Sequence, residues 1–310
     1  MKEKELKSIL DRSMSINNAT NTYAGHIDLL IDLVNYGSNL IVRALDSSKK
    51  KIEDLIIIGV LLKQIVQMVD GVQILLSAGS THPAFLQARA AFEGLLYMLF
   101  IMKQDSERRA KFYYVSCIRK QKYFALRLTP DTPERTRYEG IYKDFNEIIE
   151  SLDDSVSTQA STDLDKFNKF LEKPGWKEIN DAFENAGKKY PYWYEPLGIK
   201  SIALLASDVG ESAAYDLYYT KGSEVMHVGS YRDHILLSSG TATLEPIRHL
   251  RDANMVLQFS CQTVISSYNK ILTKYRFGEL SQFKKKYNND WRQLFLNVPS
   301  VKYTYAKKSS

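Results

Sequence analysis

The stretch at residues 83–102, PAFLQARAAFEGLLYMLFIM, is apolar at nearly every position except Arg89 and Glu93. It follows the turn signals of SAGSTHP at residues 77–83, and Pro83 suits the first turn of a helix. The two charges make it a poor candidate for crossing a bilayer. It therefore predicts a long helix within the body of a folded protein.

The same periodicity continues in both directions from this stretch. Apolar residues recur at spacings of three and four, and alternating β-branched runs are few. We therefore predict an all-α fold, a multi-helix bundle of roughly ten to twelve helices with little or no β-sheet. The predicted helices cover residues 4–16, 21–47, 50–78, 83–104, 106–128, 133–152, 162–172, 176–187, 199–208, 211–235, 243–275 and 280–297.

Composition limits the class of protein. Of the 310 residues, 44% are hydrophobic and 25% charged, as in a folded globular chain. The charged N-terminus lacks the apolar region of a secretory signal, and Cys117 and Cys261 suggest neither a disulfide framework nor a cysteine zinc site. The apolar stretch at 54–76 is interrupted by Lys63 and Asp70. We therefore expect no stable membrane insertion and a cytoplasmic location.

The length of the chain suggests one large helical unit or two coupled ones. We expect an N-terminal helical bundle over residues 1–150 and a C-terminal helical half over 175–275 that packs with it as one unit. A basic, aromatic extension over 276–310 completes the chain. The polar segment at 151–174 is typical of an exposed loop or of a boundary.

Arg89 and Glu93 form the first candidate pair, because they lie four residues apart in a helix that is otherwise apolar. Both side chains are expected to face protein, and a buried charge needs a partner. The order of cation before anion is the weaker one for stabilising a single helix, so helix propensity does not explain the pair. The alternatives are a structural ion pair between helices and a role in a site.

A second polar stripe lies in residues 216–234, DLYYTKGSEVMHVGSYRDH. Its members are separated by four, four and seven residues, which keeps them on one broad face of a helix if Gly229 does not end that helix. They are Tyr219, Ser223, His227 and His234. Gly222 and Gly229 lie on a different line of the helix, where another backbone could approach closely.

The stripe carries side chains suited to metal-independent cleavage of RNA. Histidine gains and loses a proton near neutral pH, so His227 could remove the proton of a 2′-hydroxyl. A cation must stabilise the charge that builds on the phosphate, and Lys221, Arg232 and Arg89 are the candidates. Ser223 and Tyr219 would hold the phosphate. The alternative is a core histidine whose imidazole is satisfied by a carbonyl or by Glu93.

Other chemistries find little support in the sequence. Glycine-rich nucleotide loops, HExxH and GxSxG are absent. Glu224 and His227 form a single Glu-x-x-His, whereas di-metal carboxylate bundles need that motif twice and two further carboxylates. We therefore expect neither a metal site nor a cofactor.

The C-terminal segment is strongly basic. Residues 270–310 contain ten Lys or Arg against two acidic residues, with aromatic residues between the charges. This composition suits a nucleic-acid backbone or an anionic membrane surface. The alternative is a helix whose aromatic side chains pack on the body while its lysines are solvated. The candidate nucleic-acid-binding residues are Lys284, Lys285, Lys286 and Arg292.

Residues 50–240 resemble a bacterial family that is known only as a domain of unknown function. The family is marked by an Arg-x3-Glu helix, a Trp before a short helix ending in Gly, and a Tyr-x3-Ser-x3-His helix. In this chain the first motif matches Arg89 and Glu93, the second matches Trp193, and the third matches Tyr219, Ser223 and His227.

That family is distantly similar to the HEPN group of helical ribonucleases found in toxin–antitoxin and anti-phage systems. HEPN sites pair an Arg with a His that follows four to six residues later, usually across a dimer. Here Lys221 stands where the Arg is expected, and Arg232 follows the histidine. Lysine offers a point charge where arginine offers a planar fork to phosphate.

Two functional hypotheses follow. The resemblance implies an effector of bacterial defence that cuts RNA, with His227, Arg89, Glu93, Ser223, Tyr219 and Lys221 as its site residues. Its expected partners are RNA, a second copy of the chain in a homodimer, and an antitoxin or other protein of a defence system. The alternative is a non-catalytic helical binding or sensor module, in which the same polar residues fix helix packing or line a pocket for a small ligand.

Overall fold

The structure, a computed structural model, describes residues 10–46, 55–152, 155–187, 191–227, 229, 234–238 and 241–301. Contacts divide the chain into two compact units. Unit 1 comprises residues 1–104 and 206–310, and unit 2 comprises residues 105–205. The chain therefore leaves one unit, forms the other, and returns.

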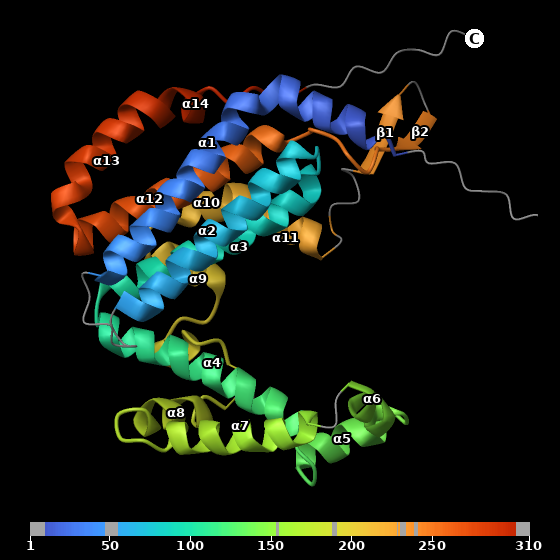
Figure 1. The fold of residues 1–310 in the computed structure, drawn as a ribbon, viewed down its shortest axis with the longest axis vertical. Helices are drawn as coiled ribbons and strands as arrows, with labels where there is room; N and C mark the ends of the chain where they lie inside the picture. The colour runs from blue at the N-terminus through green and yellow to red at the C-terminus, as the bar shows by residue number, and fades with distance from the viewer. Residues whose placement is uncertain are drawn as a thin grey trace, which may run out of the picture. The chain divides into compact units, whose positions relative to one another are not determined.

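The core of unit 1 is a bundle of four long helices that lie side by side (Figure 1). They are α1 (Arg12–Asp46), α2 (Ile57–Ser77), α3 (Thr81–Lys103) and α12 (Ala253–Tyr275). Their facing sides bury apolar residues at helical spacing, as Leu61, Leu62 and Ile65 do in α2. The bundle is close-packed at Gly37, where a Cβ atom would lie 2.2 Å from the hydroxyl of Tyr268.

The remaining elements of unit 1 flank this bundle. They are the end of α9 (Ile202–Asp208), α10 (Ser212–Ala214), the π-helical turn η3 (Tyr215–Tyr219), α11 (Thr220–Met226), and the strands β1 (Ile235–Ser238) and β2 (Thr241–Leu244). The strands pair antiparallel, with Ile235 opposite Leu244. Within the described residues, this short hairpin is the one sheet in a fold that is otherwise helical. The predicted fold class, an all-α bundle with little β-structure, is therefore confirmed.

The C-terminal segment of unit 1 packs against α1 and α12. It contains η5 (Phe277–Glu279), α13 (Leu280–Lys286), the π-helical turn η6 (Tyr287–Trp291) and α14 (Arg292–Leu296). Tyr36 of α1 contacts the rings of Phe283 and Trp291, whose centroids lie 5.7 and 5.4 Å away. The indole of Trp291 donates to Asp32 Oδ2 at 2.7 Å. Phe283 and Trp291 therefore pack on the body, while Phe277, Lys284 and Lys285 are exposed.

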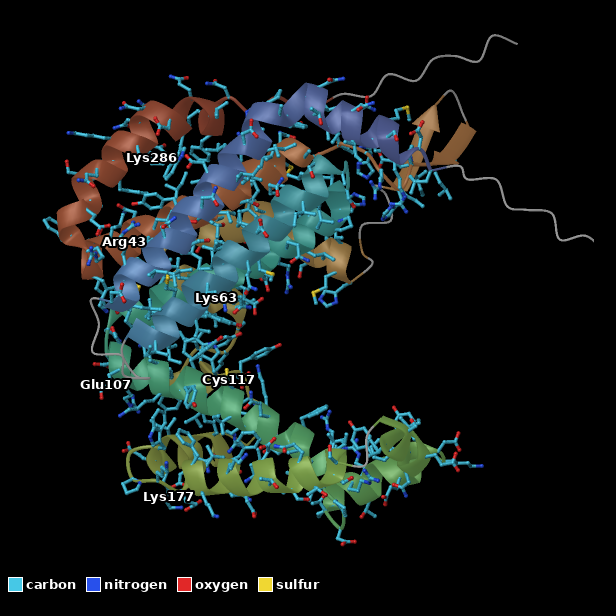
Figure 2. The ribbon with its side chains drawn as sticks, in the orientation of Figure 1. Arg43, Lys63, Glu107, Cys117, Lys177 and Lys286 are labelled. Carbon is cyan, nitrogen blue, oxygen red and sulfur yellow. The ribbon has the colours of Figure 1, made fainter. Side chains whose placement is uncertain are left out.

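Lys286 joins this segment to α1 (Figure 2). Its ammonium lies 2.7 Å from Asp32 and 3.1 Å from Asp290. Burial alone would raise the pKa of Asp32, but the hydrogen bonds from Lys286 and Trp291 outweigh that effect, and the pKa lies below its usual value. The pair is worth less than about 1 kcal/mol, because water screens two side chains that are a third or more exposed.

We predict that Asp32→Asn lowers the melting temperature slightly at pH 7, since asparagine keeps an acceptor for Trp291 but loses the charge. A carboxylate with a depressed pKa stabilises the fold above about pH 4 and loses that contribution as the pH falls through the folded-state value. The difference between variant and wild type should therefore shrink as the pH falls below about 4 and vanish once the carboxyl is protonated in the folded state as well. Asp28→Asn, at an exposed position of α1, is the control. An equal effect of both variants would contradict the prediction.

Unit 2 is a smaller helical assembly. It contains α4 (Ser106–Leu128), α5 (Pro133–Ile141), α6 (Phe145–Leu152), α7 (Val156–Leu171), α8 (Lys177–Glu184), the 3-10 turn η2 (Glu195–Leu197) and the start of α9. α4 and α7 run side by side (Figure 1). Trp193, which precedes η2, packs within this unit, because it is buried and its ring contacts that of Tyr113 at 5.5 Å.

Four predictions are corrected. The break predicted between residues 16 and 21 is absent, because Ala19 and Tyr23 are buried in the continuous helix α1 and tertiary packing outweighs the weak helix formers there. The helix predicted over 211–235 ends at Met226. The helix predicted over 243–275 begins only at Ala253, and the end of β2 and a non-helical segment occupy its first ten residues. Most of the segment at 151–174 forms α7 rather than a loop.

Helices α2 and α3 are long and apolar enough to cross a membrane by length and composition alone. Half or more of each apolar window is buried inside the fold, as in the core helices that pass the same test. These two helices are therefore weak evidence for a membrane protein.

Candidate functional site

The candidate site lies in unit 1, where α11 packs directly against α3. Gly222 makes this approach close: a Cβ atom there would lie 2.9 Å from Arg89 Cβ and 3.1 Å from the carbonyl oxygen of Phe85. The predicted close approach is therefore present at Gly222. Gly229 lies beyond the end of α11, and a Cβ atom there would meet nothing closer than 3.6 Å.

Arg89 connects the two helices. Its Nη2 donates to the hydroxyl of Tyr219 at 2.6 Å, and its Nη1 contacts Met226 Sδ at 3.1 Å. The guanidinium carbon also lies 4.5 Å from the centroid of the Tyr219 ring. Nε is buried and has no hydrogen-bond partner in the part of the chain that the structure describes. Arg89 is thus held in place with one donor unused.

Glu93 is the acceptor at the centre of the cluster. Tyr97 donates to one carboxylate oxygen at 2.6 Å, and Tyr219 donates to the other at 3.2 Å. Arg89 Nη2 lies 3.9 Å from the second oxygen. Burial and the neighbouring Glu93 charge raise the pKa of Tyr219, against the opposing effect of Arg89. Tyr219 is therefore a neutral donor at physiological pH, and it bridges the two charges.

The two polar helices, whose contact the sequence left open, therefore meet in space. The structure brings together Arg89, Glu93 and Tyr219, which the sequence singled out as separate groups. It adds Tyr97 and Met226, which the sequence analysis missed. Tyr97 could have been found, because it follows Glu93 by four residues on the same helix face. Met226 gave no signal, since a methionine in an apolar pattern indicates core packing.

The other predicted site residues lie at the edge of this cluster. His227 is exposed and caps the C-terminal end of α11, where its backbone N–H donates to the carbonyl of Ser223. Lys221 Nζ lies 4.0 Å from Glu224 Oε2. Among the described residues, the His227 imidazole makes no hydrogen bond or ion pair with Arg89 or Glu93. It follows Met226, the Arg89 contact, directly in sequence at the end of α11.

His234 does not share a face with His227, which corrects the prediction of one continuous stripe. The N–H of Gly229 bonds to the carbonyl of Glu224 at 2.7 Å, which closes the end of α11. His234 instead contacts His82 at the start of α3, with ring centroids 4.8 Å apart. Arg232, the other candidate cation near His227, lies outside the described residues.

The predicted nucleic-acid-binding residues occupy a different part of unit 1. Lys284, Lys285 and Arg292 are exposed on α13 and α14, which pack against α1 and α12, whereas α11 packs against α3. Lys286 forms ion pairs with Asp32 and Asp290. Where the structure describes side chains, no group of three or more His, Cys, Asp or Glu is placed to hold a metal ion.

Comparison with known proteins identifies one family. No curated protein and no solved structure matches the chain. A model of a family of unknown function matches residues 55–241, which include α2, α3, all of unit 2 and α11. This match spans more than half of the chain and both helices of the candidate site. The chain therefore belongs to the DUF5677 family of unknown function.

Proposed function

We propose that this protein is a metal-independent endoribonuclease and an effector of bacterial defence, distantly similar to HEPN ribonucleases. One observation carries the proposal: α11 meets a fixed guanidinium, that of Arg89, and carries an exposed histidine, His227, at its C-terminal end. Arg89 is held by Tyr219 and Met226 with its Nε donor unused, and His227 follows Met226. A cation and a proton acceptor are the two groups that this cleavage requires.

In the proposed reaction, the His227 imidazole removes the proton of a ribose 2′-hydroxyl. The 2′-oxygen then attacks the adjacent phosphorus, and the bond to the 5′-oxygen of the next nucleotide breaks. That oxygen takes up a proton from solvent, so the products carry a 2′,3′-cyclic phosphate and a 5′-hydroxyl. The role of His227 is supported by its exposure, which leaves the ring accessible to RNA.

The charge that develops on the phosphate would be stabilised by Arg89 or Lys221. Arg89 is the stronger candidate, because its side chain is only 16% exposed and a partly desolvated guanidinium interacts more strongly with an anion. Lys221 stands on the same helix as His227 and would act as a point charge. Ser223 would hold the phosphate, while Tyr219 and Glu93 would keep Arg89 in place.

The proposal is tested with purified protein and total bacterial RNA in the presence of EDTA. New fragments that end in 2′,3′-cyclic phosphate are expected, together with growth arrest when the protein is expressed in bacteria. A homodimer is expected by light scattering, since HEPN-like sites assemble across two copies. Intact RNA at protein concentrations well above those of the RNA, with unimpaired growth, would overturn the proposal.

The alternative is a non-catalytic helical binding or sensor module, and one observation favours it. Both carboxylate oxygens of Glu93 accept hydrogen bonds from tyrosines, and Tyr219 ties that carboxylate to Arg89. A polar cluster with this many internal partners fixes one packing of α11 on α3. In this reading the cluster is structural, and its residues determine stability rather than a reaction rate.

A further inference from the structure

A pocket of about 360 Å³ lies in unit 1, apart from the α3–α11 cluster. It is formed where the ends of α3 and α12, two helices of the bundle core, meet the end of α9. Its lining residues are Leu99, Met102, Lys103, Asp208, Val209, Lys270, Thr273 and Lys274. The volume lies within the usual range for sites that bind small organic ligands.

Three of the lining residues are lysines. Lys270 and Lys274 are exposed and lie four residues apart on α12, so they share one face of that helix. Lys103 donates to the backbone carbonyl of Asp208 at 2.8 Å and to its carboxylate at 2.9 Å. These three lysines outnumber the acidic groups, Asp208 in the lining and the nearby Glu211, a carboxyl whose pKa burial raises. The pocket therefore favours a multiply charged anion.

The rest of the lining is apolar or accepts hydrogen bonds. Leu99, Met102 and Val209 provide an apolar surface of a kind that an aromatic ring covers well. One oxygen of Asp208, Oδ2, is buried and has no hydrogen-bond partner within the described ranges. Because a buried acceptor without a partner is costly, it suits a ligand that brings a hydroxyl or amino donor.

We infer that this pocket binds a nucleoside polyphosphate. The phosphates would lie against Lys270 and Lys274, the base against Leu99, Met102 and Val209, and a ribose hydroxyl or base amine would donate to Asp208. Each part of such a ligand matches a separate part of the lining. The inference is independent of the proposed ribonuclease activity, because it uses none of the residues of the α3–α11 cluster.

The test is isothermal titration calorimetry of the full chain at low ionic strength with ATP, GTP, CTP and UTP. At least one is expected to bind with a Kd on the order of 10–100 μM. Lys270→Ala and Lys274→Ala should each weaken that binding about tenfold, as loss of a charge-assisted contact does. Both positions are exposed, so the melting temperature should not change. Lys63→Ala, which removes an exposed lysine of α2 (Figure 2), should bind as the wild type does.

Further titrations decide between ligand classes. Inorganic triphosphate should bind more weakly than the preferred nucleotide, and adenosine should not bind measurably. Equal affinity for inorganic triphosphate would overturn the nucleoside part of the inference. Tighter binding of a single-stranded RNA, lost in the same two variants, would make the lysines an RNA contact instead. Failure of all four nucleotides to bind at millimolar concentration, or equal binding by Lys270→Ala, would overturn the inference entirely.

Discussion

His227→Ala is expected to reduce RNA cleavage by about 100-fold or more while leaving the melting temperature within about 1 °C of wild type. The loss follows from removal of the group that accepts the 2′-hydroxyl proton. The unchanged stability follows from exposure: surface substitutions without partners usually change the free energy of unfolding by less than about 0.5 kcal/mol. The measurement is the initial rate of fragment formation with EDTA, beside a thermal unfolding curve for each variant.

His234→Ala is the matched control, because it removes another exposed histidine of unit 1 that lies outside α11. Its cleavage rate should equal that of the wild type. If His227→Ala cleaves RNA at the wild-type rate, His227 is not the base. If the variant instead melts several degrees lower and its activity follows the folded fraction, His227 stabilises the end of α11, and the role of a catalytic base is contradicted.

The sequence predicted the helical bundle well because the strongest signals were local. The apolar run at residues 83–102 lies within α3, and the bounds predicted for the next helix, 106–128, coincide with those of α4. The signal for the start of α5 was also local: Thr132 caps the helix by accepting a hydrogen bond from the N–H of Arg135, and Pro133 follows Thr132. Such signals depend on residues within one or two helical turns of each other, so a single sequence is enough to predict where these helices lie.

The arrangement of the units could not be predicted from one sequence. Unit 2 is a continuous segment, residues 105–205, between two parts of unit 1, whereas the predicted divisions lay near residues 150 and 275. The first unit boundary lies between α3 and α4 and the second lies within α9, and the sequence analysis did not identify either position as a division between units. The chain returns to a bundle that it left about a hundred residues earlier. This return depends on long-range contacts, which local patterns do not encode.

The candidate site was predicted in part for the same reason. Arg89 and Glu93 stood out because two charges in an apolar helix require partners. Tyr219 is their shared partner because of the way α11 crosses α3. Local sequence patterns do not predict this contact, because about 130 residues separate Tyr219 from the two charges. The end of α11 at Met226 separated His234 from the stripe, because a helix end is set by a few backbone hydrogen bonds that periodicity alone does not detect.

Gly222→Ala is expected to lower the free energy of unfolding by about 1–3 kcal/mol and to reduce any activity of the α3–α11 site. Alanine favours a helix over glycine by about 1 kcal/mol, so a variant without a clash would be stabilised. At Gly222 the added methyl group would lie 3.1 Å from the backbone carbonyl of Phe85 and 2.9 Å from Arg89 Cβ. Neither atom can move without shifting α3, so α11 must move away.

Gly229→Ala provides the comparison, since its methyl group would meet only ordinary contacts from 3.6 Å outward. Its melting temperature should stay close to the wild-type value, while that of Gly222→Ala should fall by roughly 2–4 °C for each kcal/mol lost. The same displacement of α11 would take Tyr219 away from Arg89 and Glu93, leaving both charges without their shared partner. If Gly222→Ala were as stable as wild type, the close approach of α11 to α3 would be wrong, and with it the geometry on which the ribonuclease and the binding-module readings both depend.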